Sequence, residues 1–357
     1  MKKSFRTVLA LLMVMALSIT VLAGCSPAPT TPSTPAEPAA PKLKAGMVTD
    51  IGGLGDKSFN DLSYAGLQKA ESELGVEIKA ISSKAMTDYD SNIAQLANAK
   101  YDVIFCVGFL MTDAISKAAT TFPDTKFGGI DIFIEKPAAN EAGLLFKEQE
   151  AGYLAGVSAG LLTKDTAVDK RINGDNVIGF VGGMPIPPVK KFEAGFIAGA
   201  KSVNPSVKVI SLYAGKFDDQ AKGKELGLSL ISQKADIIFA AAGQTGIGTF
   251  QACKEKNAFF IGVDSDQYNT LASPGDTVIT SAMKRVDTAV FETVKKVKDG
   301  TFASGNTLFG LKENGVDLAP WHEFEPKVPQ SLKDAIEKAK KAIIDGSVTV
   351  PEDPAKA

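Results

Sequence analysis

The chain has 357 residues, of which 45% are hydrophobic and 22% are charged, and its formal net charge at pH 7 is −2. This near-neutral balance, without a basic block or stripe, excludes nucleic acid as an expected partner. A single histidine and three cysteines leave little material for a metal centre, so no metal and no cofactor are expected.

The first residues have the features of a secretory leader. Basic side chains precede an apolar run over residues 8–23, which is too short and ends too abruptly for an ordinary membrane span. The run closes on the sequence LAGC at residues 22–25, which resembles a bacterial lipobox. We therefore expect a signal peptide over residues 1–24 and acyl chains on Cys25. The alternative is an ordinary secretory peptide with a chance cysteine.

A spacer rich in proline, threonine and alanine follows, so residues 25–43 are expected to be a lipid anchor and an extended tether. Folded sequence is expected from Lys44 to about Val350, with a polar tail over residues 351–357. The predicted location is the extracytoplasmic face of the cell membrane, and no second segment is long and apolar enough to span a membrane.

Short apolar runs alternate with amphipathic helical stretches through the folded part, and this rhythm occurs twice. Such repeats predict an α/β protein with two lobes, each built on a parallel, doubly wound sheet. The expected strands cover residues 44–49, 76–81, 101–107, 126–133, 177–181, 207–213, 237–241, 259–263 and 277–283. The expected helices between them cover residues 61–74, 89–99, 114–122, 148–162, 188–202, 220–233 and 245–256.

Ligands of such sheets bind at the carboxyl ends of the strands, so the loops that follow the strands are the candidate site. The loop after the first strand reads DIGGLGDKSFN over residues 50–60 and begins with Asp50. Its glycines match neither the dinucleotide fingerprint nor a phosphate loop. Phe59 and Asn60 fall in the first helical turn, where the ring is expected to face a cleft. A flexible turn with a buried phenylalanine is the alternative.

Polar groups and an aromatic ring also follow later strands, namely Asp131, Phe217, Gly243, Asp264 and Lys284. Together they suit a neutral polyhydroxylated ligand that carries a flat ring. Carboxylates accept hydrogen bonds from hydroxyl and ring N–H groups, and aromatic side chains cover the faces of the ring.

Catalysis has little support, and we expect the protein not to be an enzyme. The sequence has no GxSxG elbow, no HExxH motif and no cysteine with a histidine signature. Asp50 and Asp131 remain a formal alternative, because paired carboxylates hydrolyse glycosidic bonds. Cys106 and Cys253 are expected to be buried thiols, with a disulfide between them as the alternative.

Four motifs in order resemble the basic membrane protein family of lipoproteins, which includes a purine nucleoside receptor of spirochaetes. They are residues 50–60, 146–156 (FKEQEAGYLAG), 179–183 (GFVGG) and 261–267 (IGVDSDQ). The resemblance implies a type I periplasmic-binding-protein fold, with two Rossmann-like lobes joined by a three-segment hinge. It also implies a monomer that captures nucleosides, purines above all, for the permease of an ABC importer.

On this resemblance the N-terminal lobe comprises residues 44–148 plus 282–309. The C-terminal lobe comprises residues 149–281 plus 310–350.

The resemblance also implies roles for single residues. Asp50 and Asn60 are similar to polar groups that line the cleft, and Asp131 to a carboxylate that reads the base. Phe59 and Phe217 resemble the two walls between which the base stacks.

Gly243, Asp264 and Lys284 resemble the groups that hold the ribose hydroxyls. Two other interpretations stay open. The same fold could bind a sugar or a free nucleobase, or the lipoprotein could sense a ligand without any transport.

Overall fold

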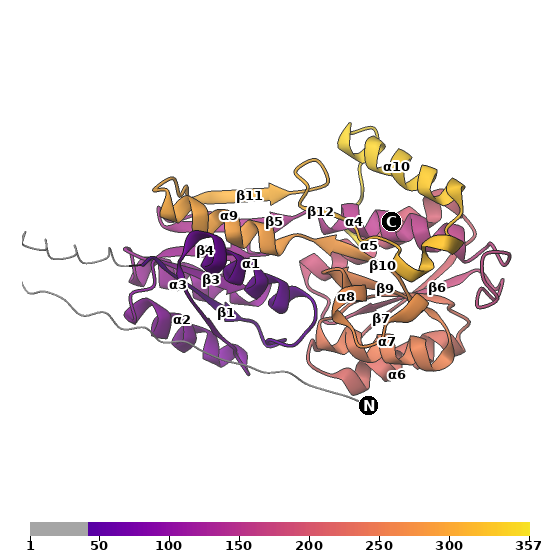
Figure 1. Ribbon diagram of the computed structural model, residues 1–357, viewed down its shortest axis with the longest axis horizontal. Coiled ribbons are helices and arrows are strands. Elements are labelled where there is room, and N and C mark those ends of the chain that lie inside the picture. Colours follow the sequence, from indigo (N-terminus) through magenta and orange to yellow (C-terminus); the bar gives the residue numbers. More distant parts are fainter. Residues whose placement is uncertain (1–41) are drawn as a thin grey trace, which may run out of the picture. The chain divides into compact units, whose positions relative to one another are not determined.

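The computed structural model describes residues 42–357, so the predicted signal peptide, Cys25 and residues 26–41 lie outside the described part. Residues Lys42–Ala357 form one compact unit. It contains two six-stranded sheets, each at the centre of one lobe (Figure 1). Within this unit no helix has the length and apolar character needed to cross a membrane.

The first lobe contains a sheet of six parallel strands in the order β11-β5-β4-β3-β1-β2. The strands are β1 (Lys44–Thr49), β2 (Glu77–Ile81), β3 (Val103–Val107), β4 (Lys126–Ile130), β5 (Glu141–Phe146) and β11 (Gly305–Phe309). Its helices are α1 (Phe59–Leu74), α2 (Tyr89–Asn98), α3 (Thr112–Thr121) and α9 (Val286–Lys298). The strand order reverses at β1, so right-handed crossovers place α1 on one face and α2 and α3 on the other. Strand β3 is buried along its whole length because both faces are covered.

The second lobe repeats this arrangement with the order β12-β10-β9-β8-β6-β7, and only β12 runs antiparallel to its neighbour. The strands are β6 (Val177–Gly182), β7 (Lys208–Tyr213), β8 (Ile237–Ala241), β9 (Phe259–Asp264), β10 (Val278–Lys284) and β12 (Val316–Leu318). The helices are α4 (Glu148–Leu162), α5 (Pro187–Val203), α6 (Gln220–Ser232), α7 (Gln244–Lys256), α8 (Gln267–Thr270) and α10 (Gln330–Ile344). Short 3-10 turns are η1 (Met86–Asp88) and η2 (Phe109–Met111) in the first lobe, and η3 (Gly275–Thr277), η4 (His322–Lys327) and η5 (Pro354–Lys356) in the second.

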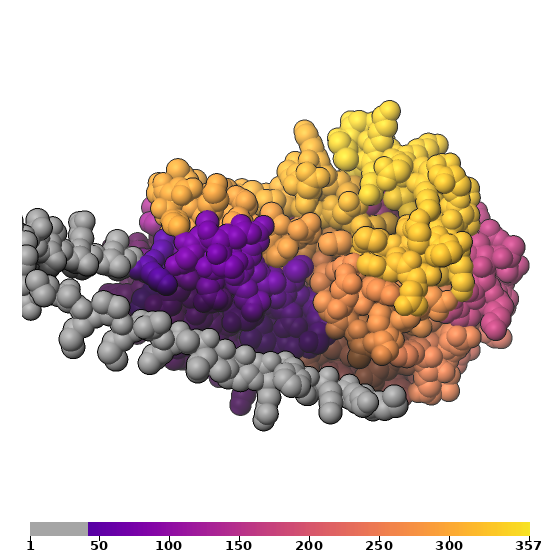
Figure 2. Space-filling model, viewed as in Figure 1, coloured from indigo at the N-terminus to yellow at the C-terminus, as the bar shows by residue number. Residues whose placement is uncertain are grey.

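The chain passes between the lobes three times, after β5, after β10 and after β11. The orange residues that follow β10 lie on the indigo first lobe in the space-filling view (Figure 2). Strand β10 pairs with β9 as far as Met283, so the lobe boundary expected at residue 282 is wrong and the crossover follows Lys284. The prediction of an α/β protein with two mainly parallel sheets is confirmed.

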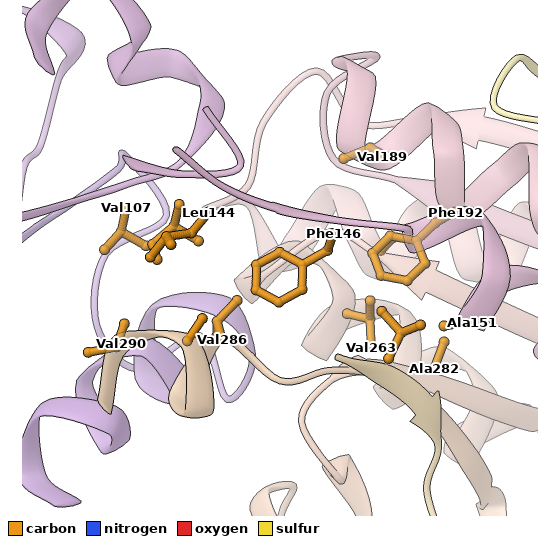
Figure 3. Packing of buried hydrophobic residues seen from close by; sticks show 14 of the residues in the cluster. Val107, Leu144, Phe146, Ala151, Val189, Phe192, Val263, Ala282, Val286 and Val290 are labelled. Atoms are coloured by element: carbon orange, nitrogen blue, oxygen red, sulfur yellow. The ribbon is translucent and has the colours of Figure 1, made fainter. Parts of the chain in front are cut away.

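Buried apolar side chains fill the space where the crossovers meet the second lobe. Phe146, at the end of β5, lies between Val286 on α9 and Phe192 on α5 (Figure 3). All three belong to one buried cluster that includes residues of both lobes. The crossovers therefore have a packed apolar base, and they are not loose linkers.

Helices α4 and α5 pack with their backbones in direct contact because glycines line the interface. A Cβ atom on Gly199 would lie 2.0 Å from the carbonyl oxygen of Tyr153, and one on Gly156 would lie 2.1 Å from that of Phe196. A Cβ atom on Gly195 would lie 2.0 Å from the carbonyl oxygen of Gln149. No other residue type fits this seam between the helices, which we call the glycine seam.

Several details of the structure differ from the predictions. Strand β5 was not predicted, and β4 ends at Ile130, before the expected residue 133, because Asp131 adopts a left-handed conformation with φ +61°. Residues 351–357, expected to be a separate tail, pack on the second lobe, where Glu352 accepts a hydrogen bond from Gln149 at 3.2 Å. Cys106 and Cys253 are separate buried thiols, as expected, and burial raises the pKa of both.

Candidate functional site

One cavity lies between the lobes, where the carboxyl ends of both sheets face each other. Its volume is about 540 Å³, counted with the solvent at its mouth, which is within the range of small-molecule sites, roughly 300–1,000 Å³. All eight predicted site residues line it: Asp50, Phe59, Asn60, Asp131, Phe217, Gly243, Asp264 and Lys284.

The loop between β1 and α1 is shaped by carboxylates that bind its own backbone. Asp56 accepts hydrogen bonds from the backbone N–H groups of Ser58, Asn60 and Asp61 at 2.8–3.1 Å, so it caps the start of α1. The Ser58 hydroxyl does not cap the helix and instead donates to Asp264 of the other lobe at 2.6 Å. Phe59 and Asn60 are thereby fixed at the cavity wall.

Asp131 and Asp264 occupy matching places in the two lobes. Asp131 directly follows β4 and Asp264 ends β9, and these strands hold the same position in the two sheet orders. Both residues adopt φ +61°, which is uncommon for a residue with a side chain. Both carboxylates are buried. Two strained aspartates therefore approach the same cavity from opposite lobes, which is typical of functional sites.

Lys284 joins these carboxylates at the centre of the site. Its Nζ lies 2.7 Å from Asp131 Oδ2, 3.5 Å from Glu148 Oε1 and 3.8 Å from Asp264 Oδ1. Burial alone would lower the pKa of Lys284, but the three carboxylates outweigh burial and raise it. The ammonium group also lies 4.6 Å from the ring centroid of Phe59. Among residues 42–357, Lys284 is the one cation in the cavity wall, and it is already paired with protein carboxylates.

Several cavity oxygens have no protein donor. Within residues 42–357, Asn60 Oδ1, Asp131 Oδ1 and Asp264 Oδ1 are buried and accept no hydrogen bond. Asp50 Oδ1 accepts from Gly52 N and Asn60 Nδ2, both at 2.9 Å. Because a buried polar atom without a partner is costly, the wall is suited to a ligand that brings hydroxyl and N–H donors.

Sequence reasoning missed part of the site. Phe192 and Val189 reach the cavity from α5, and Glu148 supports Lys284 from the crossover after β5. The loop after β6 also follows the carboxyl end of a parallel strand, so the rule that ligands bind at strand ends would have pointed to the start of α5. Glu148 had no comparable signal. No group of side chains in the described part of the chain is arranged to hold a metal ion.

The sequence matches the family described as "ABC transporter substrate-binding protein PnrA-like" over residues 43–353. The chain belongs to this family. It is 35% identical to the ABC transporter nucleoside-binding protein BmpA of Lactococcus lactis, over 97% of this chain and 99% of that protein. It is also 33% identical to basic membrane protein A of Borreliella burgdorferi, over 86% of this chain and 87% of that protein. The expected membership is confirmed.

Solved structures agree with this assignment. A solute-binding protein of an ABC transporter system from Aeropyrum pernix superposes with a TM-score of 0.79 at 29% identity, covering 87% of this chain and 94% of that chain. The predicted type I periplasmic-binding-protein fold is confirmed. As a member of this family the protein is the substrate-binding component of an ABC transporter and not an enzyme.

Four buried carboxyl groups make the stability of this family member depend on pH. Burial raises the pKa of Asp50 to about 6, of Asp56 to about 7, of Asp236 to about 6 and of Glu148 to about 8. In the unfolded chain these groups lose their protons near pH 4. The native state therefore holds more protons between about pH 5 and 8, so stability falls as pH rises through this range.

We expect the melting temperature of the protein to be higher at about pH 5 than at about pH 8. Scanning calorimetry over this range measures it directly. Asp236 accepts from Thr163 at 2.8 Å outside the cavity, so Asp236→Asn should flatten the curve without altering the site. A melting temperature that rises from pH 5 to 8 would contradict the assignment of protonated buried carboxyls.

Proposed function

We propose that the protein captures nucleosides, with purine nucleosides favoured, in the cavity between its lobes and delivers them to an ABC permease. The observation that carries this proposal is the pairing of two phenylalanine rings, Phe59 and Phe217, with carboxylate and amide oxygens that lack donors. A nucleoside supplies a flat base for the rings and hydroxyl and N–H donors for the oxygens. The name of the Lactococcus relative, a nucleoside-binding protein, supports the same ligand class.

The charges of the cavity favour a nucleoside over a nucleotide. Four carboxyl side chains line the wall, Asp50, Asp56, Asp131 and Asp264, against one lysine that is already paired. A phosphate would have to approach these carboxylates without a free cation, which is unfavourable in a buried site. Neutral ligands are therefore preferred.

Capture proceeds by closure of the hinge. The ligand meets Phe59, Asn60 and Asp131 on the first lobe and Phe217 and Asp264 on the second lobe. Only contacts made to both lobes at once favour the closed form over the open form. The permease then distinguishes loaded from empty protein by the relative position of the lobes.

The same proposal covers the location of the protein. Relatives from Pyrococcus are named lipoproteins, one of them 38% identical over 86% of this chain. Acyl chains on Cys25 would hold the protein at the extracytoplasmic face of the membrane, and residues 26–41 would leave the lobes free to close. Mass spectrometry of the protein extracted from membranes tests for the acyl chains on Cys25.

The ligand is tested by a thermal-shift screen followed by titration calorimetry. Purine and pyrimidine nucleosides, free nucleobases, pentoses and nucleoside monophosphates are compared at equal concentration. A ligand at 100 times its dissociation constant adds about 2.7 kcal/mol to the stability of the protein. We expect shifts with nucleosides and none with monophosphates. A shift with pentoses or nucleobases alone, or no shift at all with nucleosides, would overturn the proposal.

A further inference from the structure

One backbone carbonyl of the first lobe receives three hydrogen bonds from the second lobe. The carbonyl oxygen of Lys57 accepts from Ser265 Oγ at 2.9 Å, from Gln267 Nε2 at 3.2 Å and from Thr270 Oγ1 at 3.1 Å. We call these four residues the Lys57 latch. None of them lines the cavity, so the latch is separate from the ligand contacts.

The first lobe presents this carbonyl without help from the second lobe. Lys57 adopts φ +57°, an uncommon conformation for a residue with a side chain. Asp61 fixes the turn, because its carboxylate accepts from the backbone N–H groups of Lys57 at 3.1 Å and Gly55 at 2.7 Å. The strained residue is therefore held in place by contacts within its own lobe.

The second lobe fixes the donors in the same way. Gln267 Oε1 accepts from the backbone N–H of Val263 at 3.2 Å, which turns its Nε2 toward Lys57. The backbone N–H of Gln267 donates to Ser281 Oγ at 3.1 Å. His322 Nε2, from η4, lies 2.7 Å from the carboxylate of Asp266, the residue directly before Gln267. Both halves of the latch thus keep their shape in their own lobes, and the loss of entropy on closing is small.

We propose that the Lys57 latch sets the balance between the closed and open forms of the protein independently of the ligand. Contacts between the lobes break when the lobes part, so those that lie outside the cavity raise the closed population of the empty protein. They raise the apparent affinity for every ligand by the same factor, since apparent affinity scales with the fraction of competent protein. The affinity part of this inference rests on the proposed function, but the closure part does not.

The test removes two donors and keeps the rest of the loop. In the variant Ser265→Ala/Thr270→Val two of the three hydrogen bonds are lost, while Gln267 retains its bonds within the second lobe. If the two lost hydrogen bonds contribute to the free energy of closure as ordinary hydrogen bonds do, the ratio of closed to open protein should be about tenfold smaller in the variant. Small-angle scattering of the protein without ligand should show a larger radius of gyration for the variant.

Substitutions of Lys57 itself provide the matched pair. Lys57→Gly keeps the carbonyl and tolerates positive φ, so this variant should scatter like the parent. Lys57→Val disfavours positive φ because of its branched side chain, so it should open the protein as the double variant does. Circular dichroism checks that each variant is folded, and Thr270→Val alone replaces the double variant if that one unfolds.

A radius of gyration that is the same for the parent, the double variant and Lys57→Val would overturn the latch. Titration calorimetry then tests the affinity part with two nucleosides of different strength, which should lose the same factor. A loss confined to one nucleoside would instead mean that these residues act on the ligand. Failure of every nucleoside to bind would refute the proposed function and leave the scattering result as the measure of the latch.

Discussion

Replacing Lys284 by methionine is expected to lower the free energy of unfolding by about 3–5 kcal/mol and to abolish nucleoside binding. The ammonium group lies within 4 Å of Asp131, Glu148 and Asp264, and each of these side chains is buried. Without it, the site keeps carboxylates that have lost their counter-charge. Chemical denaturation monitored by circular dichroism measures the loss of stability.

Lys191 offers a matched control on the other side of Glu148. Its Nζ lies 3.7 Å from Glu148 Oε2, but its side chain is 22% exposed against 3% for Lys284. Lys191→Met should therefore cost less than Lys284→Met, because the Lys191 ammonium group keeps part of its contact with water. The deficit of Lys284→Met should also shrink at acidic pH, where the carboxyls take up protons. Equal losses in the two variants would contradict the central role of Lys284.

Truncating either aromatic wall, as Phe59→Ala or Phe217→Ala, is expected to weaken nucleoside binding by about tenfold. Stacking of a base on an aromatic ring contributes about 1–3 kcal/mol, which corresponds to roughly 5- to 150-fold in affinity. Both rings line the cavity and are only half-buried in the protein, so the folded state should survive. Titration calorimetry with one purine nucleoside measures the loss.

Phe133 supplies the control for this experiment. Its side chain is 62% exposed and does not line the cavity, so Phe133→Ala should leave the affinity unchanged. Ribose offers hydroxyl groups but no base, so any weak binding of ribose should be insensitive to the loss of either ring. Unchanged nucleoside affinity in both truncated variants would reject the two rings as stacking walls.

The cavity wall was predictable from the sequence wherever it consists of residues at strand ends. Asp131, Gly243 and Asp264 follow apolar runs that are clear in the sequence, and parallel strands bring such ends to one edge. The alternation of strands and helices likewise predicted two doubly wound lobes. Periodicity is a local property, so it survives without knowledge of the packing.

Features that depend on how the lobes pack were not predictable in this way. Phe192 reaches the cavity only because α5 lies against the crossover, and Glu148 meets Lys284 across 136 positions of the chain. Strand β5 was not predicted, and Gly143 lies within it, where an isolated glycine weakens a strand pattern. In the structure this glycine is needed, since a Cβ would lie 2.3 Å from Asn306 Oδ1.

The glycine seam couples the hinge to the wall of the cavity. Helix α4 begins at the crossover after β5, and α5 carries Val189 and Phe192 into the cavity. Because backbone meets backbone across the seam, no soft side chain lies between the helices to absorb a displacement. The two helices therefore form one rigid unit, which connects the crossover at Lys147 with the apolar wall of the cavity. A substitution that displaces α5 at the cavity wall would therefore also displace α4 at the start of the second lobe.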